Sequence, residues 1–324
     1  MSEPAANVGA RTDPGGASNS VVAPHLSPNQ RAWRRFLRNR LAVGCAGLLV
    51  VMLGIILVWP WISPHAPDAV GEAQFHPPDA THWLGTDVHG RDLLSRIFFG
   101  ARVSLLVGVI GALVSFVIGV TWGAVAGYLG GRWDSAMMRI VDVLYSLPSI
   151  VFVIVLITTI NGVLDTMKSA GLSTQGARSA QFICLFAGLG AVSWLTMARI
   201  VRGQVLSLRT RQFVDASRAL GASHARILWR HILPNVAGVI IVYLTLLVPA
   251  IILYESFLSY LGLGIQPPQA SLGSLIAEGA GQINPVRIYW WLIAFPGVML
   301  VSLLLALNFV GDGLRDAFDP RAGK

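Results

Sequence analysis

The stretch FVDASRALGASHARILWRHILPN, residues 213–235, lies between two strongly apolar runs, yet it carries arginines, two histidines and an aspartate. Its first part, up to Leu220, has the spacing typical of a helix. Gly221 interrupts that pattern as a residue that can take a positive φ at a helix end. Ser223 can cap a second short helix, which is expected to stop before Pro234. The stretch therefore predicts a polar helix–turn–helix inside an apolar chain.

The composition around this stretch is that of a membrane protein. The chain has 324 residues, of which 54% are hydrophobic and 12% are charged, whereas a soluble domain carries roughly 25% charged residues. The net charge of +8 is almost all arginine. Such a balance in a membrane protein reflects topology, and no basic patch interleaved with aromatic residues indicates a nucleic-acid partner. A polytopic membrane protein is the predicted class.

Several catalytic and binding motifs are excluded. The two lysines, Lys168 and Lys324, do not stand in a Gly-Lys-Ser/Thr context, so the chain has no P-loop for ATP. It also has no His-Glu-x-x-His and no Gly-x-Ser-x-Gly. We therefore expect no catalytic residue and no cofactor, and any ATP must be bound by another chain. Cys45 and Cys184 fall inside apolar runs and are expected to be small hydrophobic residues, not a disulfide or a metal site.

Six apolar runs are long enough to cross a bilayer core of about 30 Å as helices. They are residues 41–59, 103–127, 140–160, 181–201, 236–258 and 289–310. Glycines within them suit close helix packing; they are Gly108, Gly111, Gly119, Gly188 and Gly190. Prolines within them predict kinks; they are Pro148, Pro249 and Pro296. The predicted fold is all-α with six transmembrane helices.

The arginines predict the orientation of these helices. With the N-terminus in the cytoplasm, the internal segments hold 18 lysines and arginines and the external segments hold 6. This split satisfies the positive-inside rule. Both termini are therefore expected in the cytoplasm, and residues 213–235 fall in the longest internal loop.

Two interpretations of that loop fit its pattern equally well. Phe213, Ala216 and Leu220 fall near one face of the first helix. The helix can lie on the membrane surface as an amphipathic connector, with its arginines towards lipid headgroups. It can equally insert into a groove on a cytoplasmic partner.

The order of residues in the loop resembles the "EAA" loop of binding-protein-dependent ABC importer permeases. The matching residues are Asp215, Ala216, Ser217, Gly221, Ile227, Leu233, Pro234 and Asn235. Where the family pattern has Glu-Ala-Ala, this chain has Asp-Ala-Ser, so the acid is one methylene shorter. The resemblance implies that the loop is a coupling helix that docks into a cleft of an ATPase subunit, which favours the second interpretation.

Other blocks extend the resemblance from about residue 30 to residue 320. They are HWLGTDVHGRDLLSRIFFGARVSLLVG, GYLGGRWDSAMMRIVD, SWLTMARIVRGQVLSLR, ESFLSYLGLGIQPP, SLGSLIAEG and GDGLRDAFDP. They resemble the C-type permeases of dipeptide and oligopeptide importers, and the blocks that contain Trp194 and Glu255 look most like those of oligopeptide permeases. One departure is the external loop expected at 161–180, which is longer than is usual for that family.

The resemblance implies a type I ABC importer permease fold in a bacterial plasma (inner) membrane, working by alternating access. It also implies a second permease subunit that completes a heterodimeric pore, two cytoplasmic ABC ATPase subunits and an extracytoplasmic peptide-binding protein. The expected cargo is an oligopeptide or a dipeptide. Nickel and glutathione stay open as alternatives, because permeases for those cargoes are similar.

On this basis we expect five parts in the chain. They are a disordered cytoplasmic tail at 1–30, a cytoplasmic anchor and first transmembrane helix at 31–60, an external region at 61–101, a permease core of five helices at 102–312 with the coupling loop at 210–235, and a cytoplasmic tail at 313–324. The block GDGLRDAFDP is expected to cap and end the last helix.

Two charged residues in the spans are candidates for the transport pathway or its gate. Glu255, near the outer end of the fifth span, can meet the amino terminus of a peptide or hydrogen-bond to a neighbouring span. Arg202, at the end of the fourth span, can line the pathway or anchor the helix at the inner leaflet, and the same holds for Arg199.

The external region contains GTDVHGRD, in which Asp87, Arg91 and Asp92 are expected to pair with one another in a compact turn. The region also holds four histidines, at positions 65, 76, 82 and 89, whose spacings match no usual ligand pattern. The sequence therefore favours ordinary loop histidines over a metal site.

Two other classes of function fit the sequence less well than a permease. A secondary transporter needs ionisable groups at mid-membrane depth, but the acids Asp142 and Glu255 lie near the ends of their spans. An intramembrane enzyme needs paired acids, a histidine–metal motif or a nucleophile elbow, and the sequence has none of these.

Overall fold

The computed structural model describes residues 28–169, 174–265, 269–283 and 287–318, so the predicted tail at 1–30 lies almost entirely outside the described residues. The described residues are mostly helical, as predicted. The helices are α1 Pro28–Arg38, α2 Arg40–Ile62, α3 Leu93–Leu129, α4 Gly131–Ser146, α5 Ser149–Ser169, α6 Thr174–Leu208, α7 Gln212–Ala219, α8 His224–Arg226, the π-helical turn η1 Ile227–Ile232, α9 Leu233–Tyr260, α10 Leu272–Ala280 and α11 Trp291–Phe318.

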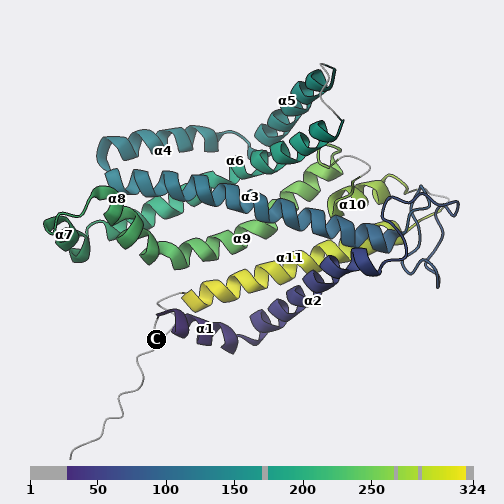
Figure 1. Cartoon of the computed structure of the whole chain (residues 1–324), viewed down its shortest axis with the longest axis horizontal. Helices are drawn as coiled ribbons and strands as arrows, with labels where there is room; N and C mark the ends of the chain where they lie inside the picture. The colour runs from purple at the N-terminus through teal and green to yellow at the C-terminus, as the bar shows by residue number, and fades with distance from the viewer. Residues whose placement is uncertain (1–27, 170–173, 266–268, 284–286, 319–324) are drawn as a thin grey trace, which may run out of the picture.

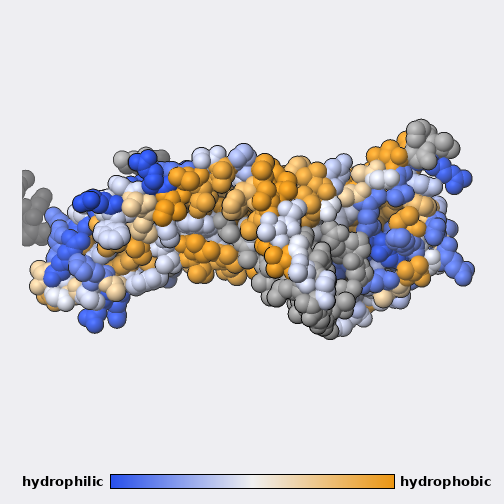
Figure 2. Space-filling view, turned by 90° about the horizontal axis from the view of Figure 1, so that it is seen from above, coloured by the Kyte–Doolittle hydropathy of each residue, from blue (hydrophilic) through white to orange (hydrophobic). Residues whose placement is uncertain are grey.

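The helices form an elongated bundle. α2, the α4–α5 pair and α9 run one way along its long axis, and α3, α6 and α11 run back (Figure 1). The connection from α2 to α3, residues 63–92, lies at one end of the axis, and α7 and α8 lie at the other. A band of hydrophobic side chains separates two hydrophilic ends (Figure 2). This is the surface expected of a bundle that crosses a membrane along its long axis.

Four helices in the described part of the chain are long and apolar enough to cross a membrane: α2, α3, residues 224–260 and α11. The α4–α5 pair makes a fifth if it counts as one bent span. The predicted span 181–201 falls inside α6, which is one continuous helix of 35 residues.

The span predicted over 140–160, with a kink at Pro148, consists of two helices that meet at a sharp bend. The chain breaks at Leu147 and Pro148, and α4 and α5 meet at 85°. Leu147 is extended, with φ −76° and ψ 137°, because a proline ring disfavours the helical conformation of the residue before it. At Pro148, where a kink was predicted, the helix is therefore broken into two, and the bend between α4 and α5 is called the elbow below.

The helices on either side of the loop expected at 161–180 are longer than predicted. α5 continues to Ser169 and α6 begins at Thr174, so most of the loop expected at 161–180 is helical. The block GDGLRDAFDP, residues 311–320, forms the end of α11, whose last described residue is Phe318 within the block. Its two glycines allow close packing. A Cβ at Gly311 would lie 2.6 Å from the side chain of Leu246 on α9, and one at Gly313 would overlap that of Ala42 on α2.

The tightest contact in the bundle joins α3 to α6 through a row of small residues spaced four apart on α3. They are Gly111, Ser115, Gly119, Gly123 and Gly127. From Ser115 onward the row faces backbone carbonyls that are also four apart on α6; they belong to Gly190, Trp194, Ala198 and Arg202. The Ser115 hydroxyl donates to Gly190 O at 2.9 Å. Small residues at this spacing let two helix backbones approach closely where lipid supplies no hydrophobic driving force.

The glycines predicted to serve helix packing include Gly108, Gly111, Gly119 and Gly190, and close contacts confirm these four. A Cβ added at any of them would lie about 2.6–3.1 Å from a neighbouring helix. Gly188 is less tightly packed, since a Cβ there would lie 3.2 Å from Leu156.

The seam between α3 and α6 yields a stability prediction. We expect Gly119→Val to destabilise the folded chain by about 1–3 kcal/mol, because its side chain would meet Met197 at 2.7 Å and the Trp194 carbonyl at 2.8 Å. Gly47→Val on α2 is the matched control, since nothing lies within 4 Å of a Cβ there, and a change below about 0.5 kcal/mol is expected. Denaturant unfolding of the purified chain measures both. Equal effects of the two variants would contradict the seam.

Candidate functional site

The polar segment at 212–232 begins with α7, which projects from one end of the bundle (Figure 1). Val214 is its one buried residue. The apolar side chains of Phe213 and Leu220 point outward and are 39% and 88% exposed. Asp215 and Ala216 are exposed too. α7 is anchored by one buried residue, and its apolar side chains are exposed. Exposed apolar side chains on a short projecting helix are typical of a surface that a partner covers.

Gly221 ends α7 as predicted, with φ +76°. The Gly221 N–H donates to Arg218 O at 2.9 Å, and the Ala222 N–H donates to Ser217 O at 3.1 Å. These two bonds form a Schellman motif, which requires a left-handed residue at this position. A Cβ at Gly221 would meet nothing within 4 Å, so glycine is needed here for its backbone conformation and not for space.

The second half of the segment departs from the prediction. Ser223 caps α8 as expected, accepting from Arg226 N at 3.4 Å, but the helix does not stop before Pro234. It passes through η1 directly into α9. The Leu233 N–H donates to Leu228 O, five residues back, and the Asn235 side chain donates to His231 O at 2.6 Å. Pro234, which has no N–H to donate, thus lies directly after the widened turn, at the start of α9.

A buried apolar cluster attaches the segment to the bundle. Val214 of α7 and Ile227, Leu228 and Ile232 of η1 are buried. They pack with side chains of α3, α6 and α9, among them Tyr128, Val201, Val205, Val236 and Ile240. Of the predicted docking residues, Ile227 therefore belongs to the attachment, whereas Asp215, Ala216 and Pro234 are exposed and Ser217 is half-buried.

Polar contacts reinforce this attachment at the end of α3. The Tyr128 hydroxyl lies 2.8 Å from His224 Nδ1. Arg209, just before α7, donates to the carbonyls of Gly127 and Tyr128 at 3.4 Å. Sequence reasoning missed the pair of Tyr128 and His224, because the two residues are 96 positions apart. By contrast, the Asp215–Arg218 pair is exposed on both sides at 3.4 Å, and such pairs contribute little.

Glu255 is fully buried between α9, α3 and α10. Its carboxyl group accepts from Ser259 Oγ at 2.6 Å and from Ser104 Oγ of α3 at 3.1 Å. Ser271, the N-cap of α10, donates to Ser259 Oγ at 3.3 Å. The hydrogen bond to a neighbouring span is thus present, and the residue joins three helices.

Arg202 lies where α6 passes the start of α4. It forms a two-pronged ion pair with Asp134, with Nε–Oδ1 at 2.5 Å and Nη2–Oδ2 at 2.7 Å. One turn earlier, Arg199 pairs with Asp142 at 2.8 Å and lies over the ring of Tyr145. The two arginines therefore bind α4 to α6.

A cavity of about 440 Å³ opens at the elbow between α4 and α5, against α6 and α9. Its lining includes hydroxyl groups from three of these helices, on Tyr145, Thr196 and Tyr254, together with the ring of Phe152. Tyr145 and Tyr254 are 53% and 41% exposed. Partly exposed residues that carry hydroxyl groups suit a surface that faces another protein or water better than one that faces lipid tails.

Buried ion pairs at the opposite end attach residues 63–92 to α10. Asp87 binds Arg91 Nε at 2.7 Å, as the sequence predicted, and also Arg96 Nη1 at 2.5 Å. Arg96 Nη1 also donates to Glu278 Oε2 of α10 at 2.6 Å. Asp92 does not join this group. It caps α3 through Ser95 N at 2.9 Å and lies 3.1 Å from His82 Nδ1.

Sequence comparison covers nearly the whole chain. The family described as "Binding-protein-dependent transport system inner membrane component" matches residues 119–324, and "N-terminal TM domain of oligopeptide transport permease C" matches residues 27–80. The oligopeptide transport system permease protein OppC of Escherichia coli (strain K12) is 46% identical over 90% of this chain and 91% of its own. The dipeptide transport system permease protein DppC of Bacillus subtilis (strain 168) is 44% identical over 94% and 89%.

The fold is similar to that of a solved transporter. A chain of the MetNI methionine ABC transporter, in an inward-facing conformation, superposes with a TM-score of 0.51 at 21% identity. The match covers 69% of this chain and 97% of that one.

The buried ion pairs give a pH-dependent prediction. Burial by itself raises the pKa of Asp87, but Arg96 and the hydrogen bonds from Arg91 and His89 outweigh it and bring the pKa below its usual value. An acid with a lowered pKa stabilises the fold above its unfolded pKa of about 3.9, and this contribution is lost as the pH falls through the lower, folded value. We expect Asp87→Asn to cost about 3 kcal/mol at pH 7.

Unfolding of the wild type and the variant at neutral pH and near pH 3 measures this effect. The difference should shrink at the lower pH, because Asp87 of the unfolded wild type binds a proton there before the folded protein does, which favours unfolding of the wild type. Asp68→Asn, at an exposed acid in the connection between α2 and α3, is the control and should change stability by less than about 0.5 kcal/mol at either pH. A difference for Asp87→Asn that grows on acidification would contradict the assignment.

Proposed function

The chain belongs to the family of binding-protein-dependent transport system inner membrane components, as a permease subunit of an ABC importer, and on this premise we propose that it forms half of a translocation pathway for peptides. The permease subunit is a transport protein of the inner membrane and not an enzyme. The similarity to permeases named for oligopeptides and dipeptides supports a peptide cargo.

The proposed mechanism rests on the short connections between the exposed helix α7 and the two long helices α6 and α9. α7 follows α6 after three residues, and the π-helical turn beyond it runs without a break into α9. The same buried cluster contains Val214 of α7 and residues of α3, α6 and α9. A force applied to α7 is therefore transmitted to these helices as a rigid body, since packed interfaces do not deform continuously.

In this proposal residues 210–235 are the coupling loop, and α7 is the part that docks into an ATPase subunit. Phe213, Ala216 and Leu220 would enter the partner's cleft, because they are exposed on one short helix. Asp215 and Ser217 flank that face. Two ATPase subunits would supply the free energy of ATP hydrolysis, and closure of the pair would move α6 and α9 together.

A second permease subunit would complete the pathway. We place the contribution of this chain at the α4–α5 elbow, because residues that carry hydroxyl groups line its cavity among apolar residues. Arg202 and Glu255 would act near the two ends of this pathway by holding α4 to α6 and α9 to α3. The end that carries residues 63–92 would meet the extracytoplasmic peptide-binding protein.

We further propose six transmembrane spans, with α6 and the bent α4–α5 pair completing the four long apolar helices, and both termini in the cytoplasm. The split of 18 internal to 6 external lysines and arginines supports this orientation. Reporter fusions after Gly131 and after Ala222 should report cytoplasm, and fusions near Asp79 should report the exterior. An external signal at Ala222 would overturn both the topology and the coupling role.

Gly221 offers the most specific test of coupling. We expect Gly221→Val to abolish most peptide uptake and most ATPase stimulation by the binding protein, because a β-branched residue at φ +76° costs about 1–3 kcal/mol or reshapes the turn. Gly221→Asn is the matched control. It adds a side chain at the same place but tolerates the left-handed conformation, so it should retain most activity.

Membrane abundance of both variants should stay near that of the wild type, because insertion depends on the apolar spans. Asp215→Ala should have a smaller effect than Gly221→Val, since its exposed ion pair is worth at most about 1 kcal/mol. Normal uptake by Gly221→Val would show that the turn is not needed, and would favour a passive connector.

A further inference from the structure

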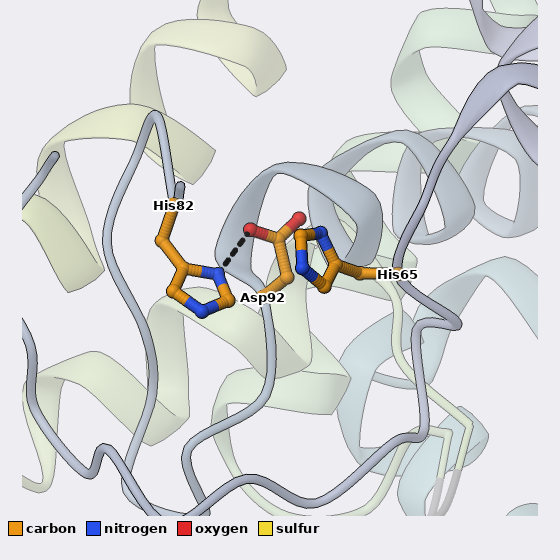
Figure 3. A group of neighbouring side chains, drawn as sticks. All are labelled: His65, His82 and Asp92. Carbon is orange, nitrogen blue, oxygen red and sulfur yellow. Dashed lines mark hydrogen bonds and ion pairs between the residues drawn. The ribbon is translucent and has the colours of Figure 1, made fainter. Parts of the chain in front are cut away.

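Three side chains converge at the end of the bundle opposite α7, where the chain passes from α2 to α3. His65 follows α2, His82 lies in the loop before α3, and Asp92 is the N-cap of α3 (Figure 3). One ligand atom from each lies within 4.8 Å of the others. His82 Nδ1 is 3.1 Å from Asp92 Oδ1, and the two imidazole rings are 4.8 Å apart between centroids.

From this arrangement we propose that His65, His82 and Asp92 bind one divalent transition-metal ion of the zinc type. Two imidazole nitrogens and one carboxylate oxygen are a donor set that suits Zn²⁺ and Co²⁺, whereas Mg²⁺ and Ca²⁺ prefer oxygen alone. Water would take the fourth position. The proposal is independent of the cargo and of the coupling mechanism.

The charge around Asp92 favours a cation. Its carboxylate is 5% exposed, and its one ion-pair partner among the described residues is His82. The nearby arginines are engaged elsewhere, because Arg91 and Arg96 bind Asp87 and Glu278. A buried carboxylate needs a positive partner. A metal ion would take the place of the proton that otherwise lies between His82 and Asp92.

The local structure already positions two of the three ligands. Asp92 is fixed because its Oδ2 accepts from Ser95 N at 2.9 Å. His82 is fixed because its backbone N–H donates to Asp79 Oδ1 at 2.5 Å. With metal–ligand distances of about 2.0–2.2 Å, the ligand atoms of a tetrahedral site lie about 3.4 Å apart. The 3.1 Å between His82 and Asp92 is close to that separation.

His65 is the ligand that must adjust, and the structure leaves it free to do so. Its backbone is held by Ser63, whose Oγ accepts from His65 N at 3.2 Å and lies 2.7 Å from Ser95 Oγ. Among the described residues, no hydrogen bond or ion pair engages its imidazole, which is half-buried against His82. A small rotation of this ring would complete the site. The ion would then join the end of α2 to the start of α3.

Cobalt titration of the full-length chain tests the proposal. The chain should carry an affinity tag without histidine and be stripped of metal in detergent. We expect one Co²⁺ per chain with the strong visible absorption of tetrahedral coordination, displaced by Zn²⁺ but not by Mg²⁺. Zn²⁺ should also raise the Tm, because it binds the folded state.

Two variants should remove a metal ligand while the chain still folds. His65→Ala leaves the His82–Asp92 contact intact, and Asp92→Asn keeps an N-cap residue while losing the charge. Each should weaken Co²⁺ binding at least about 10-fold. Even mutation of a residue that only hydrogen-bonds to a metal ligand lowers metal affinity about 10–100-fold. His89→Ala, at an exposed external histidine, is the matched control and should bind as the wild type does. Absence of tetrahedral Co²⁺ binding, or equal binding by His65→Ala and His89→Ala, would overturn the proposal.

Discussion

The close approach of α3 and α6 is the contact on which the rest of the structure depends. Helices in lipid gain no hydrophobic free energy from packing against one another, so association rests on tight contact and on hydrogen bonds. The row from Gly111 to Gly127 supplies the contact, and Ser115 supplies a hydrogen bond to α6. At the α7 end of the seam, Gly127 meets the Arg202 carbonyl and Tyr128 meets His224. The seam thus ends at the segment proposed to dock.

This arrangement explains how a short exposed helix can act on a long bundle. α7 has one buried residue of its own, Val214, and by length alone it would be a weak helix. Its position is set by the Schellman turn at Gly221 and by the buried residues of η1, which continue into α9. Docking energy applied to α7 therefore acts on α6 and α9 together.

Local chemistry was predictable from the sequence, and long-range contacts were not. The positive φ of Gly221 and the cap at Ser223 depend on neighbouring residues, and both predictions are confirmed. The family was likewise expected from its motifs and is confirmed. The prediction that the helix ends before Pro234 was wrong, because the π-helical turn η1 leads directly into α9, which contains the proline. The Arg96–Glu278 pair was missed, since 182 residues separate its partners. His65, His82 and Asp92 converge only because three segments fold together.

The central claim is that α7, η1 and α9 move as one body, and a distance measurement within the chain tests it most directly. Spin labels at Ala219 and Tyr260, both exposed, would be introduced after replacement of Cys45 and Cys184. The assembled transporter would be measured without nucleotide and with ATP trapped. The account predicts a mean distance that changes by less than about 2 Å between the two states. A change of about 5 Å or more, one helical turn, would contradict it, because α7 would then move independently of α9.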